Sequence, residues 1–154
     1  MFVRPAQEQD LAGFLQLAAE VEHWFGPMVE DPGFRRAVER HIRRSTALVA
    51  ASAGPELLGG MLFGTKGMAH HVHWLVVAER ARGRGVGRAL FADAMHRFVR
   101  GPGTLEVVTF GADHPGAVDS GARAFYEALG FTPAEAADPG PEGGSRQIYR
   151  RAVS

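Results

Sequence analysis

The sequence predicts an α+β fold in which a mixed sheet of about six to seven strands is flanked by about four helices. Three observations predict it. Short β-favouring runs alternate with segments of helical apolar spacing. Their order, β-α-α-β-β-β-α-β-α-β-β, joins neighbouring hairpins to at least one helical crossover, as in a mixed sheet. The length of 154 residues is typical of one domain, so we expect residues 1–154 to form a single domain.

Apolar spacing predicts two helices near the start of the chain. The first is expected over residues 8–21, where apolar side chains recur on one helix face. The second is expected over residues 32–44, with a proline in its first turn and Asp31 as its N-cap. A Gly-Pro pair breaks the pattern between them and leaves Trp24 and Phe25 on a connection. These two rings either fill the core or form one wall of an apolar ligand pocket.

The expected strands are short runs of β-branched, aromatic or small residues between turn signals. They are residues 2–4, 46–52, 59–63, 70–77 and 105–110, a run that starts at residue 131, and residues 147–153. Two further helices are expected over residues 86–100 and 117–129. Residues 133–145 are rich in proline, glycine and acidic residues, so we expect a mobile loop there.

Composition excludes several kinds of partner and site. Lys plus Arg and Asp plus Glu both total 17, so the formal net charge is zero and predicts no general attraction to nucleic acid or to an anionic membrane. Cysteine is absent, which excludes disulfides, zinc–thiolate sites and a cysteine nucleophile. No apolar run approaches the roughly 20 residues of a membrane span, and the first residues lack the apolar core of a signal peptide. We therefore expect a cytoplasmic protein.

A glycine-rich turn joins the expected strand over residues 70–77 to the helix that follows. Gly83, Gly85 and Gly87 permit backbone conformations closed to other residues, and they let several N–H groups face one anion at the helix N-terminus. A dinucleotide-binding G-x-G-x-x-G motif would need glycine where Arg88 stands, and a P-loop would need Gly-Lys-Ser/Thr. The turn is therefore predicted to bind a phosphate group, but by neither the dinucleotide-binding motif nor the P-loop.

Two motifs, in this order, resemble the GNAT N-acetyltransferases. The pattern R-x-x-G-x-G at positions 82–87 resembles the pyrophosphate loop with which that family binds acyl-CoA. The pattern A-x-x-x-Y-x-x-x-G-F at positions 122–131 is similar to the segment that closes the family's fold. The resemblance covers residues 72–131 and implies a GNAT fold. It also implies that acetyl-CoA lies between two splayed parallel strands, here residues 70–77 and 105–110.

The resemblance implies which residues bind acetyl-CoA. Strand backbone would hold the pantetheine arm, and the turn would hold the pyrophosphate. The implied set is Leu75, Val76, Val77, Arg82, Gly83, Arg84, Gly85, Val86, Gly87, Arg88, Asp119 and Tyr126. Asp119 stands where the family often has asparagine, and a carboxylate cannot donate a hydrogen bond as an amide does.

Tyr126 is the candidate general acid. When a neutral amine attacks a thioester, a CoA thiolate leaves, and a phenol within hydrogen-bond reach of the sulfur can protonate it. The alternative is that Tyr126 packs in the core beside Phe125, as helical tyrosines commonly do. The Gly-Phe pair at positions 130–131 favours the catalytic interpretation.

His71 and His73 are the candidate bases. On a strand they share one face, and His70 takes the other. An amine is mostly protonated at neutral pH and must lose a proton before it attacks, which a histidine can accept. The H-x-H pattern resembles that of the arylalkylamine N-acetyltransferases, which implies a role in proton removal. The alternative is a surface or structural role at the start of the strand.

From these observations and the resemblance we expect an acyl-CoA-dependent N-acyltransferase, and more specifically an acetyltransferase. The amine would attack the thioester directly in a ternary complex. Backbone N–H groups near Val77 would stabilise the oxyanion. Four apolar side chains are candidates for the wall of the acceptor pocket, namely Trp24, Phe25, Met28 and Phe63. They favour an aromatic or aliphatic amine, while a peptide amine, a polyamine and an antibiotic amine stay open.

Two other functions stay open at this stage. A binding module could keep the phosphate turn and act as a non-catalytic acyl-CoA sensor. Alternatively, His71 and His73 with a carboxylate such as Asp113 could ligate zinc or iron, although we expect no metal. The family resemblance also allows a homodimer.

Overall fold

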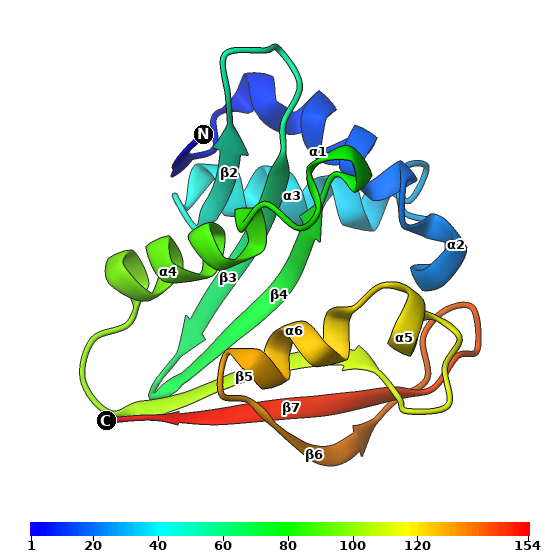
Figure 1. Cartoon of the computed structure of the whole chain (residues 1–154). Helices are drawn as coiled ribbons and strands as arrows, with labels where there is room; N and C mark the ends of the chain where they lie inside the picture. The colour runs from blue at the N-terminus through cyan, green and yellow to red at the C-terminus, as the bar shows by residue number, and fades with distance from the viewer.

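A seven-stranded sheet forms the centre of the molecule, with the strand order β1-β2-β3-β4-β5-β7-β6 (Figure 1). The computed structural model describes residues 1–154. The strands are β1 Phe2–Pro5, β2 Ala47–Ala51, β3 Gly59–Lys66, β4 Ala69–Val77, β5 Gly103–Phe110, β6 Thr132–Ala137 and β7 Arg146–Val153. Only β4 and β5 pair in parallel, and all other neighbours are antiparallel. The predicted α+β fold with a mixed sheet is confirmed.

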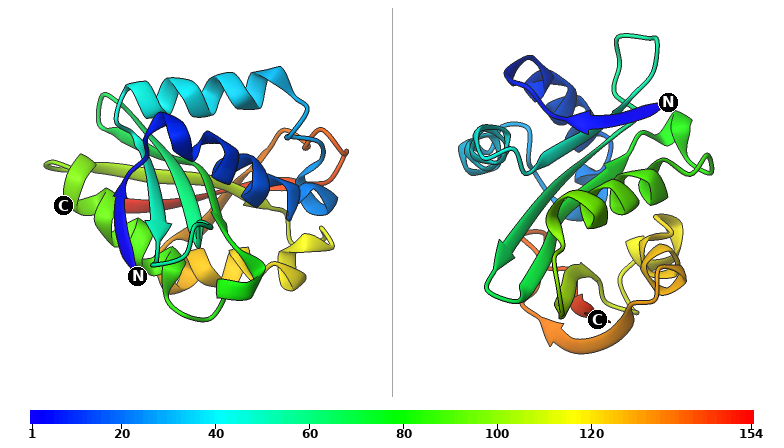
Figure 2. Two further views of the ribbon diagram at one scale, coloured as in Figure 1. Left: turned by 90° about the horizontal axis from the view of Figure 1, so that it is seen from above. Right: turned by 90° about the vertical axis from the view of Figure 1, so that its left-hand side faces the viewer.

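Helices cover both faces of the sheet (Figure 2). They are α1 Leu11–Ala19, α2 Glu22–Phe25, α3 Pro32–Arg43, α4 Val86–Phe98, α5 Gly116–Asp119 and α6 Ala122–Ala128, with 3-10 turns η1 Glu8–Asp10 and η2 Glu79–Ala81. One face carries α1 and α3, and the other carries α4 and α6. The predicted N-cap of α3 is confirmed, because the Asp31 carboxylate accepts a hydrogen bond from Gly33 N–H at 2.9 Å. None of these helices combines the length and the apolar character needed to cross a bilayer.

The sheet opens at its centre. The parallel pairing of β4 with β5 is confined to Ala69–Val72 against Thr104–Val107, and beyond it the two strands diverge. On the other edge of β4, Leu62 pairs with Trp74 and Phe63 pairs with Val72, so His73 is an extra residue opposite β3. Such a bulge bends the strand and re-aims its side chains. The divergence and the bulge coincide, and they create the space in which the site lies.

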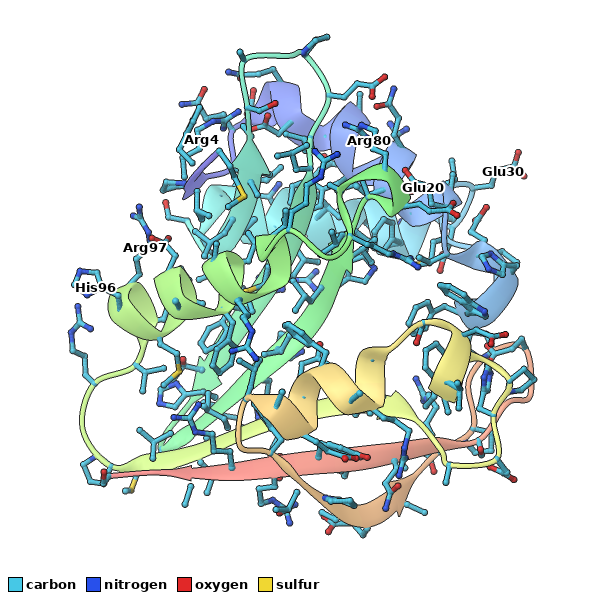
Figure 3. The ribbon with its side chains drawn as sticks, viewed as in Figure 1. Arg4, Glu20, Glu30, Arg80, His96 and Arg97 are labelled. Atoms are coloured by element: carbon cyan, nitrogen blue, oxygen red, sulfur yellow. The ribbon has the colours of Figure 1, made fainter.

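Two polar anchors hold the segment that leads from β4 to α4. Glu20, at the end of α1, accepts a hydrogen bond from the Glu79 N–H at 2.8 Å, and the Arg80 guanidinium donates to the Leu57 carbonyl at 3.2 Å. Figure 3 shows Glu20 and Arg80 side by side above the glycine turn. Because the first two residues of η2 are fixed, the turn that follows starts from a defined position.

Two predicted segments differ from the structure. The helix expected over residues 117–129 is interrupted, because Gly121 adopts a left-handed conformation (φ +71°) between α5 and α6. The mobile loop expected over residues 133–145 was wrong for its first part, where β6 forms as an edge strand against β7. Pro133 is tolerated there because an edge strand has one side free of ladder hydrogen bonds.

Two smaller differences concern the start of the chain. Residues 8–10 form a 3-10 turn rather than the first turn of α1. Trp24 and Phe25 lie on the short helix α2, not on an irregular connection. The Glu22 carboxylate holds the following segment by accepting from Met28 N–H at 2.6 Å and from Val29 N–H at 3.0 Å. Side chains of α2 are thereby directed at the opening between β4 and β5.

Candidate active site

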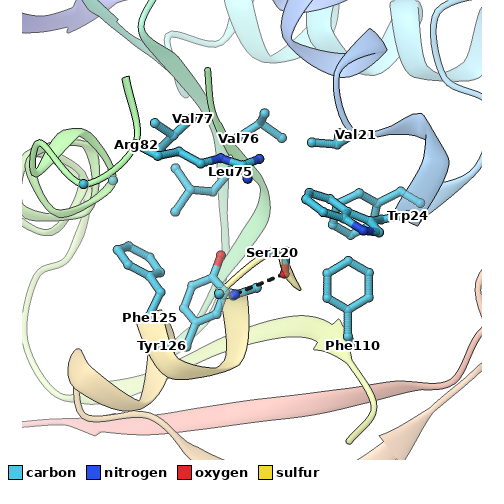
Figure 4. A pocket seen from close by; sticks show the side chains of 15 residues that line it. Val21, Trp24, Leu75, Val76, Val77, Arg82, Phe110, Ser120, Phe125 and Tyr126 are labelled. Atoms are coloured by element: carbon cyan, nitrogen blue, oxygen red, sulfur yellow. Dashed lines mark hydrogen bonds between the residues drawn. The ribbon is translucent and has the colours of Figure 1, made fainter. Parts of the chain in front are cut away.

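A cavity of about 250 Å³ lies between α2, the end of β4, the glycine turn and α6 (Figure 4). We call it the turn-side cavity. Its wall is mostly apolar. The lining residues are Val21, Trp24, Phe25, Leu75, Val76, Val77, Arg82, Gly83, Gly87, Phe110, Ser120, Gly121, Ala122, Phe125 and Tyr126. The apolar wall and the few convergent polar groups are typical of a small-molecule site.

The glycine turn has the conformation that the sequence predicted. Gly83 and Gly85 have positive φ values of 76° and 81°, and Gly85 is the N-cap of α4. The side chain of Val86 is buried in the core, and the first backbone N–H groups of this 13-residue helix have no intrahelical partners, as at the start of any α-helix. These donors and the helix dipole attract an anionic group such as pyrophosphate.

Gly85→Ala is expected to weaken CoA binding about tenfold, because a Cβ at this φ strains the turn and re-aims its N–H groups. Gly101→Ala is the matched control, since Gly101 has a similar φ of 72° in the loop after α4. Both variants should lose about 1–2 kcal/mol of stability, which is the cost of a left-handed residue with a side chain. Calorimetric titration with CoA and denaturant unfolding measure the two effects. Equal loss of CoA affinity in both variants would contradict the role of the turn.

A second cavity of about 390 Å³ lies on the other side of the opening in the sheet, and we call it the acceptor-side cavity. Aromatic and apolar side chains of α2, the connection after it, α3 and β4 form much of its wall, including Met28, Phe34 and Trp74. The two cavities share six lining residues, namely Phe25, Leu75, Val76, Phe110, Ala122 and Tyr126. A ligand in one cavity can therefore meet a ligand in the other at these residues.

Tyr126 stands where the two cavities meet. Its ring packs edge-on against Phe125 and Phe131, with ring centroids 5.1 and 5.6 Å away. The side chain is only 6% exposed, and the hydroxyl points into the cavity toward Leu75 (Figure 4). Burial raises the pKa of Tyr126 above its usual value of 10.0, so the hydroxyl stays protonated and can donate.

The backbone of β4 presents hydrogen-bonding groups to the opening. Ala78 N–H donates to the Leu58 carbonyl at 2.8 Å, on the β3 side. Successive residues of a strand direct their N–H and C=O groups to opposite edges, so Leu75 and Val77 direct theirs away from β3. No strand pairs with them there, because the pairing with β5 ends at Val72. These groups are available to an amide-containing ligand arm.

His71 and His73 share a face of β4, as predicted. Their rings stack 5.6 Å apart, and the ring of His41 from α3 lies 5.6 Å from His73. His70 points to the opposite face, where it is buried and stacks on Phe63. His73 lines the acceptor-side cavity, which places an imidazole at the wall of this space.

The electrostatic environment favours the neutral form of His73 and of His41. Loss of hydration, then the nearby His71 and Arg40, lower the pKa of His73 below 6.5. Burial, then His73, lowers the pKa of His41 to about 4. His71 has its Nδ1 3.7 Å from a Glu106 carboxylate oxygen. A neutral imidazole can accept a proton, so His73 suits the role of a base.

Not every predicted residue joins the site. Phe63 was expected beside Trp24, Phe25 and Met28, but it is 1% exposed and stacks on Phe98 in the core. Asp119 is exposed on α5 and lines neither cavity, whereas Ser120 lines the turn-side cavity.

The metal hypothesis finds no ligand set in the structure. Asp113 does not lie with His71 and His73, and its carboxylate accepts a hydrogen bond from Ser145. No group of three or more His, Cys, Asp or Glu side chains is arranged to hold a metal ion.

The structure also contributes residues that the sequence did not single out. Phe110 stacks on Phe25 with ring centroids 4.7 Å apart, and it lines both cavities. Trp74 lines the acceptor-side cavity, and the ring of His41 lies beside that of His73. The bulge at His73 accounts for the position of Trp74. Because His73 is an extra residue on the strand, two successive side chains, His73 and Trp74, both line the acceptor-side cavity. The sequence around His41 gave no indication that it lies beside His73, since its proximity to β4 arises only from tertiary packing.

Comparisons with known proteins agree with this geometry. The family model described as "Acetyltransferase (GNAT) domain" matches residues 43–133, which include the glycine turn and Tyr126. None of the curated protein sequences matches the chain significantly.

Solved structures with the same fold are numerous. An acetyltransferase of the GNAT family from Desulfovibrio desulfuricans superposes with a TM-score of 0.77 at 23% identity, covering 99% of this chain and 98% of that one. A ribosomal-protein-alanine N-acetyltransferase from Brucella melitensis gives 0.72 at 21% identity, with 99% and 100% covered. The PaiA N-acetyltransferase from Thermoplasma acidophilum, in complex with coenzyme A, gives 0.73 at 15% identity, with 98% of each chain covered.

The family match spans more than half of the chain, and it includes β4, the glycine turn and α6, which contribute to the walls of the cavities. The glycine turn and the tyrosine on α6 are the features that had suggested this family from the sequence, and the opening between β4 and β5 is what that resemblance implied. The chain belongs to the GNAT family of acetyltransferases, and it is an N-acetyltransferase that uses acetyl-CoA as its cosubstrate.

Proposed function

We propose that the enzyme transfers the acetyl group of acetyl-CoA directly to a small primary amine within a ternary complex. The observation that carries this proposal is the pair of cavities that approach Tyr126 from two sides. Acetyl-CoA would lie in the turn-side cavity, and the amine would enter the acceptor-side cavity. Its aromatic wall favours an amine with an apolar body.

The chain's backbone would position the thioester. The turn from Arg82 to Arg88 would bind the pyrophosphate, and backbone groups of Leu75 and Val77 would hold the pantetheine arm. An N–H group near Val77 would then stabilise the oxyanion that forms when the amine attacks the carbonyl carbon.

Three proton transfers complete the proposed reaction. The ammonium group loses a proton to His73 or His71, and the lone pair of the resulting amine forms the new C–N bond. The C–S bond breaks, the sulfur takes the electron pair, and the Tyr126 hydroxyl protonates the departing thiolate. The nitrogen then gives up its second proton, which leaves a neutral amide and restores the phenol. The buried phenol remains protonated until it is needed, because burial raises its pKa.

His73→Gln is expected to lower kcat about tenfold and to shift or abolish the acidic inflection of its pH profile. The pKa of His73 is below 6.5, so its base form is lost only as the pH falls through that lower value. The wild-type kcat for an alkylamine should therefore reach its plateau at a lower pH than a histidine of ordinary pKa would give. The loss stays moderate because His71 lies beside it.

His96→Gln is the control for this profile, since His96 is exposed at the far end of α4 (Figure 3). Measuring kcat from pH 5 to pH 8 at saturating substrates separates the two variants. An acidic inflection that is unchanged in His73→Gln would exclude His73 as the base.

The direct test of the proposed function is release of free CoA thiol from acetyl-CoA in the presence of aryl amines, alkylamines, polyamines, aminoglycosides and peptides. Turnover with one class would support the proposal and identify the acceptor. Binding of acetyl-CoA without turnover would favour a non-catalytic sensor. A stable acetyl-enzyme, detected by mass spectrometry without acceptor, would contradict direct transfer.

A further inference from the structure

A third cavity, of about 430 Å³, lies between the end of α3 and the hairpin of β3 and β4. Its ionisable lining is entirely basic. The residues are Arg40, His41, Arg44, Lys66, His71 and His73, and we call this cavity the basic pocket. No carboxylate lines it. Three permanent positive charges therefore face one small volume in a chain whose net charge is zero.

These charges have no partners within the protein. Other arginines form ion pairs, such as Arg4 with Asp10 and Arg150 with Glu106 and Glu135. None of the ion pairs includes Arg40, Arg44 or Lys66. The Glu106 carboxylate, which lies 3.7 Å from His71 Nδ1, is already bound to Arg150. Unpaired cations around one cavity attract a compact oxyanion.

The acceptor-side cavity has the opposite character. Its ionisable lining includes the carboxylates of Asp31 and Glu142, together with Arg146 and His73. Asp31 caps α3, and Glu142 lies 3.4 Å from His114. An ammonium group is favoured near these carboxylates, whereas an anion is favoured in the basic pocket. The two cavities thus present complementary charges to the two ends of one zwitterion.

His73 is the only ionisable residue that lines both cavities. Its Nε2 lies 2.5 Å from the point that a Cβ on Gly64 would occupy, so the absence of a side chain at Gly64 lets the imidazole pack onto β3. The ring therefore stands at the boundary between the acidic and the basic space. A ligand that passes His73 would reach both.

We propose that the acceptor is an amine that also carries a compact oxyanion, a carboxylate or a phosphate, and that the basic pocket binds this oxyanion. The amine would lie in the acceptor-side cavity, beside His73 and within reach of the thioester. This inference rests on the proposed acetyl transfer and narrows its acceptor to a zwitterionic class.

Binding of the oxyanion would also assist the base. Arg40 contributes to the lowered pKa of both His41 and His73. An anion beside Arg40 offsets that positive charge, so the His73 imidazole becomes a stronger base when such an acceptor is bound. An amine that lacks the anionic group leaves the pocket's charge uncompensated.

The test compares ω-aminocarboxylates and aminoalkyl phosphates of increasing chain length with alkylamines of equal length. Calorimetry in the presence of CoA measures binding, and thiol release from acetyl-CoA measures turnover. We expect the anionic amines to bind more tightly than the matched alkylamines. Arg40→Gln should raise their Kd about tenfold, the effect of one lost charged hydrogen bond. Arg43→Gln is the control, because Arg43 lies on the same helix but does not line the pocket.

The outcomes separate this inference from the proposed function. Turnover of alkylamines with no preference for anionic amines would overturn the inference and leave the acetyl transfer intact. Arg40-dependent binding of anionic amines without turnover would retain the basic pocket and contradict acetyl transfer to them. Arg40-dependent binding of inorganic phosphate that does not compete with any anionic amine would overturn the assignment to the acceptor and indicate a site for free anions.

Discussion

Tyr126→Phe lowers kcat by about 10² to 10⁴-fold in the mechanism proposed for this enzyme, with little change in the KM for acetyl-CoA. This range is the usual contribution of a positioned general acid. The ring of phenylalanine preserves the edge-on contacts with Phe125 and Phe131, so only the hydroxyl is removed. No other tyrosine lines either cavity, which means that no second phenol can replace it.

Tyr149→Phe is the matched control for this substitution. Tyr149 is the only other tyrosine of the chain, it is fully buried, and its hydroxyl donates to Glu127 at 2.8 Å. Its loss should cost about 1 kcal/mol of stability, typical of one hydrogen bond, and leave kcat nearly unchanged. Full turnover of Tyr126→Phe across the pH range would remove Tyr126 from the chemistry.

Phe14→Ala is expected to lower the free energy of unfolding by about 3–5 kcal/mol, a large share of the stability of a typical domain. Phe14 has no exposed surface, and its ring centroid lies 5.7 Å from that of Trp74. It also packs so closely over Gly60 that a Cβ there would lie 2.8 Å from the ring. A void at this position cannot be filled by β3, because Gly60 has no side chain.

The same substitution should weaken the acceptor site, since Trp74 forms part of its wall. Denaturant unfolding measures the stability, and the KM for the amine reports the wall. Phe2→Ala is the control, because Phe2 is 55% exposed and its loss should change stability by less than about 0.5 kcal/mol. A loss below about 1 kcal/mol for Phe14→Ala would show that the core closes over the void.

The glycine turn could be predicted from the sequence because its chemistry is local. Gly83 and Gly85 adopt the left-handed conformations that only glycine adopts readily, and the helix begins at Val86 as its apolar spacing indicated. Tyr126 could also be singled out, because its spacing from the Gly-Phe pair lies within one short segment; it lines both cavities, and its catalytic role stays a prediction. In both cases the functional geometry depends on neighbours in the sequence.

Other features depend on contacts between distant segments and carried no such signal. The strand β6 forms in a segment rich in proline and glycine because β7 offers it a partner, and Gln147 donates to the Ala134 carbonyl at 2.9 Å. Phe63 is a large apolar residue of the kind that lines ligand pockets, but it packs on Phe98 from α4. His41 meets His73 only because α3 crosses β4. Secondary-structure propensity and the spacing of apolar residues predict none of these contacts between distant segments.

The short parallel pairing at the centre of the sheet has a mechanical consequence. Strands β1 to β4 form one plate and β5 to β7 another, and backbone pairing joins them only through the four residue pairs from Ala69↔Thr104 to Val72↔Val107. The pairing with β5 therefore involves only four of the nine residues of β4. A cofactor that contacts both β4 and α6 would connect the two groups of strands where the backbone does not.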